Sequence, residues 1–202
     1  LEMAAEVAKR LNLTIAYQPI AWDAKDMELD AGTIDCIWNG FTMNGREDDY
    51  EWSKPYMKNN QVFVVRGDSD INSEADLAGK NVEVQTDSSA EAALNDNSEL
   101  TSMFGSLTPV ADYNTAFMDL ESGAVDAIAM DDVVASYQIT SRKADFKVLD
   151  DVIAAEEYGI GFKKGNTGLR DKVQATLEEM AADGTAAKIS EKWFGKDITT
   201  IQ

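Results

Sequence analysis

Charged residues of opposite sign follow two copies of one short segment of the chain. Residues 29–37 (LDAGTIDCI) and 120–128 (LESGAVDAI) share the pattern Leu-x-(Ala/Ser)-Gly-x-(Ile/Val)-Asp-x-Ile. Arg46 comes after the first copy, and Asp131 and Asp132 come after the second. A guanidinium group pairs with a carboxylate, and an aspartate pairs with an ammonium group. The two charges therefore suit a free amino acid.

Each copy predicts a helix that ends at a glycine and an apolar strand that follows it. Gly32 and Gly123 stand where a helix commonly ends in the left-handed conformation, which glycine adopts at no steric cost. In open α/β sheets, ligands bind beyond the carboxyl ends of the strands. We therefore expect two similar lobes, with the ligand held between their strand ends.

Apolar periodicity over the whole chain predicts an α/β fold. Strands alternate with helices, which favours mainly parallel pairing. The chain begins inside an amphipathic stretch at Leu1, with no helix cap before it, so we expect a segment upstream of Leu1 to be missing. The predicted helices are 1–11, 24–30, 90–94, 115–121, 169–182 and 185–194, and the predicted strands are 13–17, 36–38, 61–65, 81–85, 108–111, 147–149 and 159–162.

The composition restricts the partners of the protein. Its 202 residues include 37 acidic and 18 basic side chains, which give a net charge of −19. Such a surface repels nucleic acids and anionic lipid headgroups, so we expect neither as a partner. No apolar run reaches the length that spans a membrane.

Catalytic and metal-binding motifs are poorly represented. The sequence contains no histidine, and its single cysteine, Cys36, lies in an apolar strand. The stretch 68–79 has the acid spacing of a calcium loop, but Ser73 replaces its glycine and Gly79 its bidentate glutamate. The glycines at 159–165 lack the spacing of a dinucleotide fingerprint. We therefore expect no cofactor, no metal and no enzymatic activity.

Seven short segments, taken in order, resemble the amino-acid-binding subunits of ABC importers. These are type II periplasmic binding proteins of the polar amino acid group, family 3 of the solute-binding proteins. The resemblance covers essentially the whole chain. The segments are Trp22-Asp23, Gly40 to Arg46, Trp52 to Tyr56, Asp76 to Lys80, Val84 to Ser89, Gly123 to Asp131 and Ala182 to Gly195.

The resemblance implies two lobes that are joined by two crossover strands and close on a ligand. One lobe would combine 1–57 with 159–202, and the other would be 61–154. The crossovers would lie at 57–61 and 154–159. The implied function is capture of a free amino acid and its delivery to the permease subunits of an ABC transporter. The implied location is extracytoplasmic, either in the periplasm or lipid-anchored at the outer face of the cell membrane.

The resemblance also implies which residues bind the carboxylate of the ligand. Arg46 matches the arginine of the family that binds this group, and Thr42 matches the residue whose hydroxyl and backbone N–H meet it. Three residues separate the two here, where the family usually has four. Ser89, preceded by Ser88, matches a backbone donor at the start of a helix. Either serine could also simply cap that helix.

The ammonium group and the side chain of the ligand would be bound by other residues. Asp131 matches the ammonium-binding aspartate, and Asp132 is the alternative candidate. The carbonyl of Gly40 and the side chain of Asn39 would be further acceptors. Residues expected to line the side-chain pocket, and so to influence specificity, are Trp22, Gln85 and Met130.

Two alternatives share this fold, and the sequence leaves both open. One is the ligand-sensing domain of a membrane receptor, and the other is a dehydratase-like enzyme. The resemblance also implies that the first strand of the fold lies before Leu1. We therefore expect the present chain to self-associate, because the missing strand would expose a sheet edge and an apolar helix face. The identity of the amino acid is not set by these residues.

Overall fold

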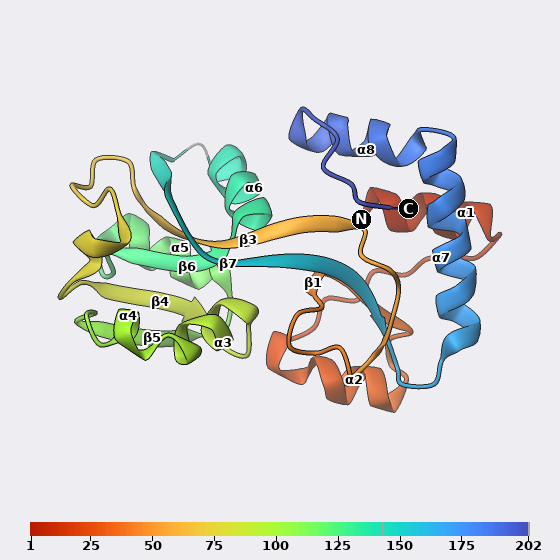
Figure 1. Ribbon diagram of the computed structural model, residues 1–202, viewed down its shortest axis with the longest axis horizontal. Coiled ribbons are helices and arrows are strands. Elements are labelled where there is room, and N and C mark those ends of the chain that lie inside the picture. The colour runs from red at the N-terminus through yellow and green to blue at the C-terminus, as the bar shows by residue number, and fades with distance from the viewer. Residues whose placement is uncertain (143, 202) are drawn as a thin grey trace. The chain divides into compact units, whose positions relative to one another are not determined.

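The computed structural model describes residues 1–142 and 144–201, which form two compact units (Figure 1). The first unit comprises Leu1–Ile20, Ala24–Lys58 and Glu156–Gln202, and the second comprises Ala21–Asp23 and Asn59–Ala155. Gln202, the last residue of the first predicted lobe, lies outside the described residues.

The chain passes between the units twice. It does so between Lys58 and Asn59 and again between Ala155 and Glu156. Both points fall inside the predicted crossovers 57–61 and 154–159. The role of these segments as hinges remains a prediction.

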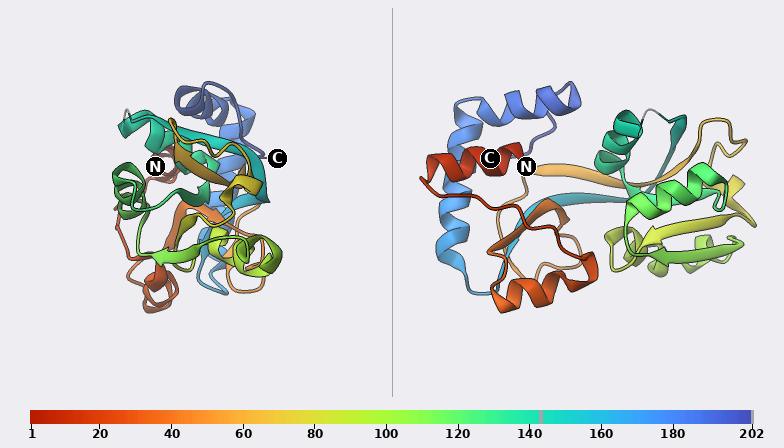
Figure 2. Two further views of the ribbon diagram at one scale, coloured as in Figure 1. Left: turned by 90° about the vertical axis from the view of Figure 1, so that its left-hand side faces the viewer. Right: turned by 180° about the vertical axis from the view of Figure 1, so that it is seen from behind.

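In the first unit, short strands are combined with four helices. The long strand β7 (Phe146–Phe162) pairs antiparallel with β1 (Cys36–Thr42) and β2 (Glu51–Trp52). Three helices lie side by side in the views of Figures 1 and 2. They are α1 (Glu2–Arg10), α7 (Thr167–Ala182) and α8 (Thr185–Phe194), and the fourth helix is α2 (Lys25–Ala31).

In the second unit, a mixed sheet has the strand order β7-β3-β6-β4-β5. The ladder of β3 with β6 is antiparallel, and those of β4 with β5 and β6 are parallel. The expected parallel pairing is therefore found around β4, whereas the ladder of β3 with β6 runs the other way. The strands are β3 (Met57–Arg66), β4 (Asn81–Gln85), β5 (Ser106–Val110) and β6 (Ala127–Asp131).

Helices cover both faces of this second sheet (Figure 2). Phe63 and Val65 of β3 belong to the hydrophobic cluster that includes residues of α3 (Ser89–Asp96) and α4 (Ser98–Thr101). Val64 belongs to the opposite cluster, with residues of α5 (Tyr113–Ser122) and α6 (Asp132–Arg142). A strand buried on both faces reads as a continuous apolar run, which is why 61–65 was recognisable from the sequence. Two short 3-10 helices, Trp22–Ala24 and Glu74–Leu77, complete the elements.

One predicted strand is absent, and two others belong to a single longer strand. Residues 13–17 form no strand, and Leu13, Ile15 and Tyr17 are exposed. Their alternating, β-branched pattern favours a strand, but a strand also requires a hydrogen-bonded neighbour, and the ladders that the structure describes include none here. The strands predicted at 147–149 and 159–162 are two ends of the single strand β7.

Glycine is required where β7 crosses the aromatic cluster of the first unit. The rings of Phe41, Tyr50 and Trp52 pack with centroids 4.8–5.2 Å apart. A methyl group added at Gly161 would lie 2.7 Å from Cε1 of Phe41. That distance is well inside van der Waals contact, so the rings can pack this closely only because Gly161 has no side chain.

We predict that Gly161→Ala lowers the free energy of unfolding by about 1–3 kcal/mol, the usual cost of overpacking a core. Gly168→Ala is the matched control, because a methyl group at Gly168, in the first turn of α7, has no heavy atom within 4 Å. The control should be at least as stable as the parent. Urea denaturation measures both variants, and equal stabilities would contradict the packing argument.

Candidate functional site

Each repeated segment folds as predicted, into a helix that ends at glycine and a strand that follows it. Gly32 ends α2 and Gly123 ends α5, both in the left-handed conformation with φ of 73° and 79°. The strands β1 and β6 follow, and they end at Thr42 and Asp131. Two of the predicted ligand-binding residues thus terminate equivalent strands, one in each unit.

Arg46 lies in the turn that follows β1. Its backbone N–H donates to Met43 O at 2.9 Å, and its Nη1 donates to Thr42 O at 3.3 Å. The guanidinium carbon lies 5.4 Å from the centre of the Phe41 ring. Trp52 Nε1 donates to Arg46 O at 2.9 Å. The short loop therefore holds the half-buried Arg46 directly beside Thr42.

Thr42 makes a contact that the sequence did not suggest. Its side chain is buried, and its hydroxyl donates to Glu156 Oε2 at 2.8 Å. Glu156 lies on β7 and is itself only 7% exposed. Because a hydroxyl carries a single proton, this bond must be exchanged before Thr42 can donate to a ligand carboxylate.

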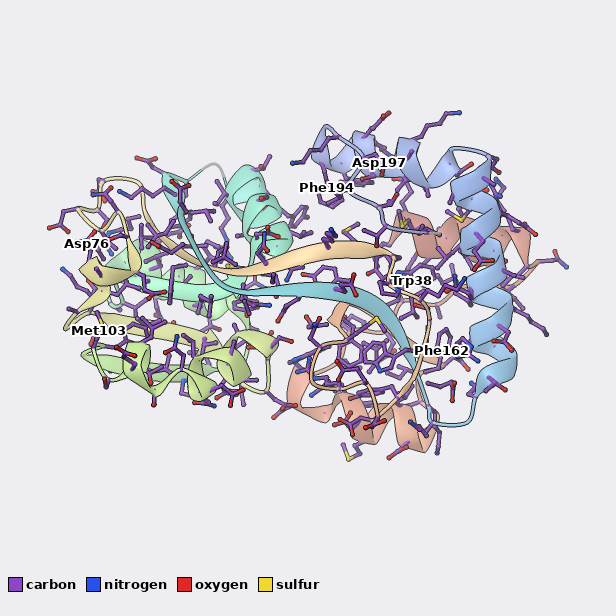
Figure 3. All side chains as sticks on the ribbon, in the orientation of Figure 1. Trp38, Asp76, Met103, Phe162, Phe194 and Asp197 are labelled. Carbon is purple, nitrogen blue, oxygen red and sulfur yellow. The ribbon has the colours of Figure 1, made fainter. Side chains whose placement is uncertain are left out.

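Gly40 is needed for the course of β1. Its φ is 86°, and a Cβ atom would lie 3.0 Å from the ring of Tyr158. The hydroxyl of buried Tyr56 is hydrogen-bonded to the backbone of Gly40 and to the side chain of Trp38, which Figure 3 labels. Burial raises the pKa of Tyr56, so the phenol stays neutral. Asn39, the neighbouring candidate, is exposed.

Asp131, in the second unit, is held by two amide groups. Its Oδ1 accepts hydrogen bonds from Asn59 Nδ2 at 2.7 Å and from Gln61 Nε2 at 2.9 Å. Gln61 is also its direct neighbour across the ladder of β3 and β6. Both amide residues are buried, at 3% and 0% exposure.

Asp132 has a different environment from Asp131. It is the first residue of α6, where a carboxylate interacts favourably with the helix dipole. Its Oδ2 accepts from Asn60 Nδ2 at 3.2 Å, and its Oδ1 is buried with no hydrogen-bond partner among the described residues. The two aspartates are thus separately anchored, Asp131 by Asn59 and Gln61 and Asp132 by Asn60.

The predicted serines lie at the start of α3. Ser88 is the N-cap, and its Oγ accepts from Glu91 N at 3.1 Å. Ser89 is the first helical residue and is half-buried. The first N–H groups of a helix have no partner within the helix and favour a nearby anion. Before the cap, Asp87 adopts a positive φ of 58°, and its carbonyl accepts from Trp22 Nε1 at 3.1 Å.

The remaining specificity candidates occupy contrasting positions. Gln85 ends β4 and donates from Nε2 to Ala111 O at 3.2 Å. Met130 is completely buried in the hydrophobic cluster shared with α5 and α6. The geometry therefore supports Gln85 better than Met130 as a contact for a ligand side chain.

Cys36 begins β1, the strand that carries Gly40 and Thr42. It pairs with Phe162 of β7, which Figure 3 labels. Burial, with a further contribution from Asp35, raises the pKa of the Cys36 thiol to about 11. The thiol is therefore neutral at physiological pH, and the side chain is half-buried rather than part of the core.

Sequence reasoning missed Glu156, Asn59 and Gln61. The local sequence carries little signal for them, because other polar residues flank them in β3 (MKNNQVFVVR) and in β7 (FKVLDDVIAAEEYGIGF). Among the described residues, no group of three or more His, Cys, Asp or Glu side chains is arranged to hold a metal ion. No helix in the described ranges is long and apolar enough to cross a bilayer.

Known proteins resemble this chain over nearly its whole length. The family model of bacterial extracellular solute-binding proteins, family 3, matches residues 1–196. The L-cystine-binding protein TcyA of Bacillus subtilis (strain 168) is 32% identical over 202 residues, which cover 98% of this chain and 73% of TcyA. The L-cystine-binding protein TcyJ of Escherichia coli (strain K12) is 31% identical, covering 98% and 74%.

A solved structure supports the fold. The substrate-binding protein of an ABC uptake transporter from Streptococcus pneumoniae, with bound histidine, superposes with a TM-score of 0.93. It is 33% identical, and the match covers 98% of this chain and 83% of that one. The similarity spans both units, so the fold is the type II periplasmic binding protein fold that the sequence resembles.

Proposed function

The chain belongs to the bacterial extracellular solute-binding proteins of family 3, and we propose that it binds a free amino acid and delivers it to the permease subunits of an ABC importer. The single observation that carries this proposal is the family match over residues 1–196. The named relatives are binding proteins, which favours a role in binding rather than in catalysis. We place the protein outside the cytoplasmic membrane, as the description of the family states.

We assign the ligand carboxylate to Arg46, Thr42 and the first turn of α3. The proximity of Arg46 and Thr42 supports the first two, since a guanidinium fork and an adjacent donor fit a carboxylate. Ser88 and Ser89 begin a helix, whose positive dipole end favours an anion. In this proposal, Thr42 exchanges its bond to Glu156 when the ligand binds.

The ammonium group of the ligand is assigned to Asp131, with Gly40 and Asn39 as further acceptors. The bonds from Asn59 and Gln61 support Asp131 over Asp132, because they stabilise its ionised form at a fixed position. Trp22 and Gln85 are the proposed contacts for the ligand side chain. Charge and exposure do not select one amino acid.

The proposal is tested by a thermal-shift screen of the twenty common amino acids and L-cystine. We expect at least one to stabilise the protein, by about 2.7 kcal/mol at a concentration one hundred times its Kd. Calorimetry then measures the Kd. Absence of binding by all twenty-one compounds would contradict the proposed function.

We predict that Arg46→Ala abolishes measurable binding of the amino acid that the screen identifies. Loss of a buried charge-assisted partner costs about 2–5 kcal/mol, which is about 30- to 5,000-fold in Kd. Arg46→Lys should also bind poorly, because an ammonium group cannot form the bidentate pair. Circular dichroism checks that both variants are folded, and a near-normal Kd for either would remove Arg46 from the site.

We predict that Asp131→Asn weakens binding of an amino acid far more than binding of its analogue without the amino group. Two suitable pairs are L-cystine with 3,3′-dithiodipropionate and L-histidine with 3-(imidazol-4-yl)propanoate. Calorimetry on each pair gives the difference in binding free energy. Equal losses for both members of a pair would mean that Asp131 does not contact the ammonium group, and Asp132→Asn is the matched test of the alternative.

A further inference from the structure

The start of β3 combines deep burial with polar side chains. Asn59 is 3% exposed and Gln61 is 0% exposed, although Val62, Phe63 and Val64 continue the same strand into the hydrophobic core. Burial of an amide costs free energy unless the group is hydrogen-bonded. Valine or isoleucine would fill a central strand without this cost, so the amides call for an explanation other than packing.

Both amides converge on one atom. Asn59 Nδ2 and Gln61 Nε2 donate to the same oxygen, Oδ1 of Asp131, at 2.7 Å and 2.9 Å. They reach it from two positions, i and i+2, of one strand, and Asp131 is paired with Gln61 in the adjacent strand. Residues i and i+2 of a strand point to the same face, which brings both amides to the carboxylate.

We propose that Asn59 and Gln61 are positioning residues for recognition of the α-ammonium group. They hold the carboxylate of Asp131 in one orientation and in its ionised form, and they thereby set the affinity of the protein for amino acids over carboxylic acids that lack the amino group. This inference rests on the proposed function and extends it to two residues that do not themselves contact the ligand.

The physical basis is the strength of hydrogen bonds to a charged acceptor. Two donors to one carboxylate oxygen favour the ionised form and restrict rotation about the side-chain bond. Amide donors keep their protons at every physiological pH. Their N–H groups also have fixed directions, whereas a hydroxyl can rotate toward another acceptor.

The neighbouring residue Asn60 supplies a matched control. It lies between Asn59 and Gln61 on β3, and its Nδ2 donates to Oδ2 of Asp132 at 3.2 Å. The same kind of bond therefore joins β3 to the other aspartate, which is the first residue of α6. If Asp131 is the ammonium-binding residue, removal of the amide of Asn60 should have little effect on selectivity for the amino group.

The experiment compares Gln61→Met with Asn60→Ala by calorimetry. Methionine keeps the length and volume of the side chain but removes the donor. The probes are L-cystine with 3,3′-dithiodipropionate and L-histidine with 3-(imidazol-4-yl)propanoate, or an equivalent pair built on the amino acid found in the screen. We expect Gln61→Met to raise the Kd of the amino acid about tenfold, equal to about 1.4 kcal/mol of binding free energy. The Kd of the analogue should change less than twofold.

Asn60→Ala should change the Kd of both members of the pair less than twofold. If Gln61→Met does not fold by circular dichroism, Asn59→Ser replaces it, because serine is too short to reach Asp131 and keeps a polar group. Equal losses for amino acid and analogue would reduce the amides to a structural role, and unchanged affinities would overturn the inference. A parent protein that binds no amino acid overturns the proposed function instead, and this inference with it.

Discussion

Burial of polar groups at the start of β3 is the constraint that joins the fold to the site. Asn59 and Gln61 are withdrawn from water, and the carboxylate of Asp131 offsets the cost by accepting from both. This works in one register only, since a slip of one residue would turn every side chain of the strand to the opposite face. The same register places Phe63 and Val64 in their separate hydrophobic clusters. Core packing and the charge at the strand end are therefore specified together.

Local features of this structure could be predicted from the sequence. Gly32 and Gly123 end helices as predicted, and the predicted ranges 81–85 and 185–194 are β4 and α8 to the residue. Each depends on residues close together in the chain. A left-handed conformation at glycine, an apolar run and a helical periodicity are each properties of a single segment. They can be predicted without knowing which segments pack against it.

Features that depend on partners far away in the sequence could not be predicted from it. Residues 13–17 have the composition of a strand, but the described ladders give them no neighbour. The hydroxyl of Thr42 meets Glu156, which is 114 positions away. Asn59, Asn60 and Gln61 fall within the predicted crossover 57–61, but the local sequence does not show that their amides donate to Asp131 and Asp132, which are 70–72 positions away. Candidate residues could therefore be named from sequence, but the groups that orient them required coordinates.

The state of Cys36 has a consequence for the chemistry of the protein outside the cell. A thiolate attacks disulfides to form a mixed disulfide. Cys36 lies on the strand that carries Thr42, yet its pKa of about 11 leaves almost none of it as thiolate at neutral pH. A protonated thiol reacts poorly with disulfides, so Cys36 is poorly suited to thiol–disulfide exchange.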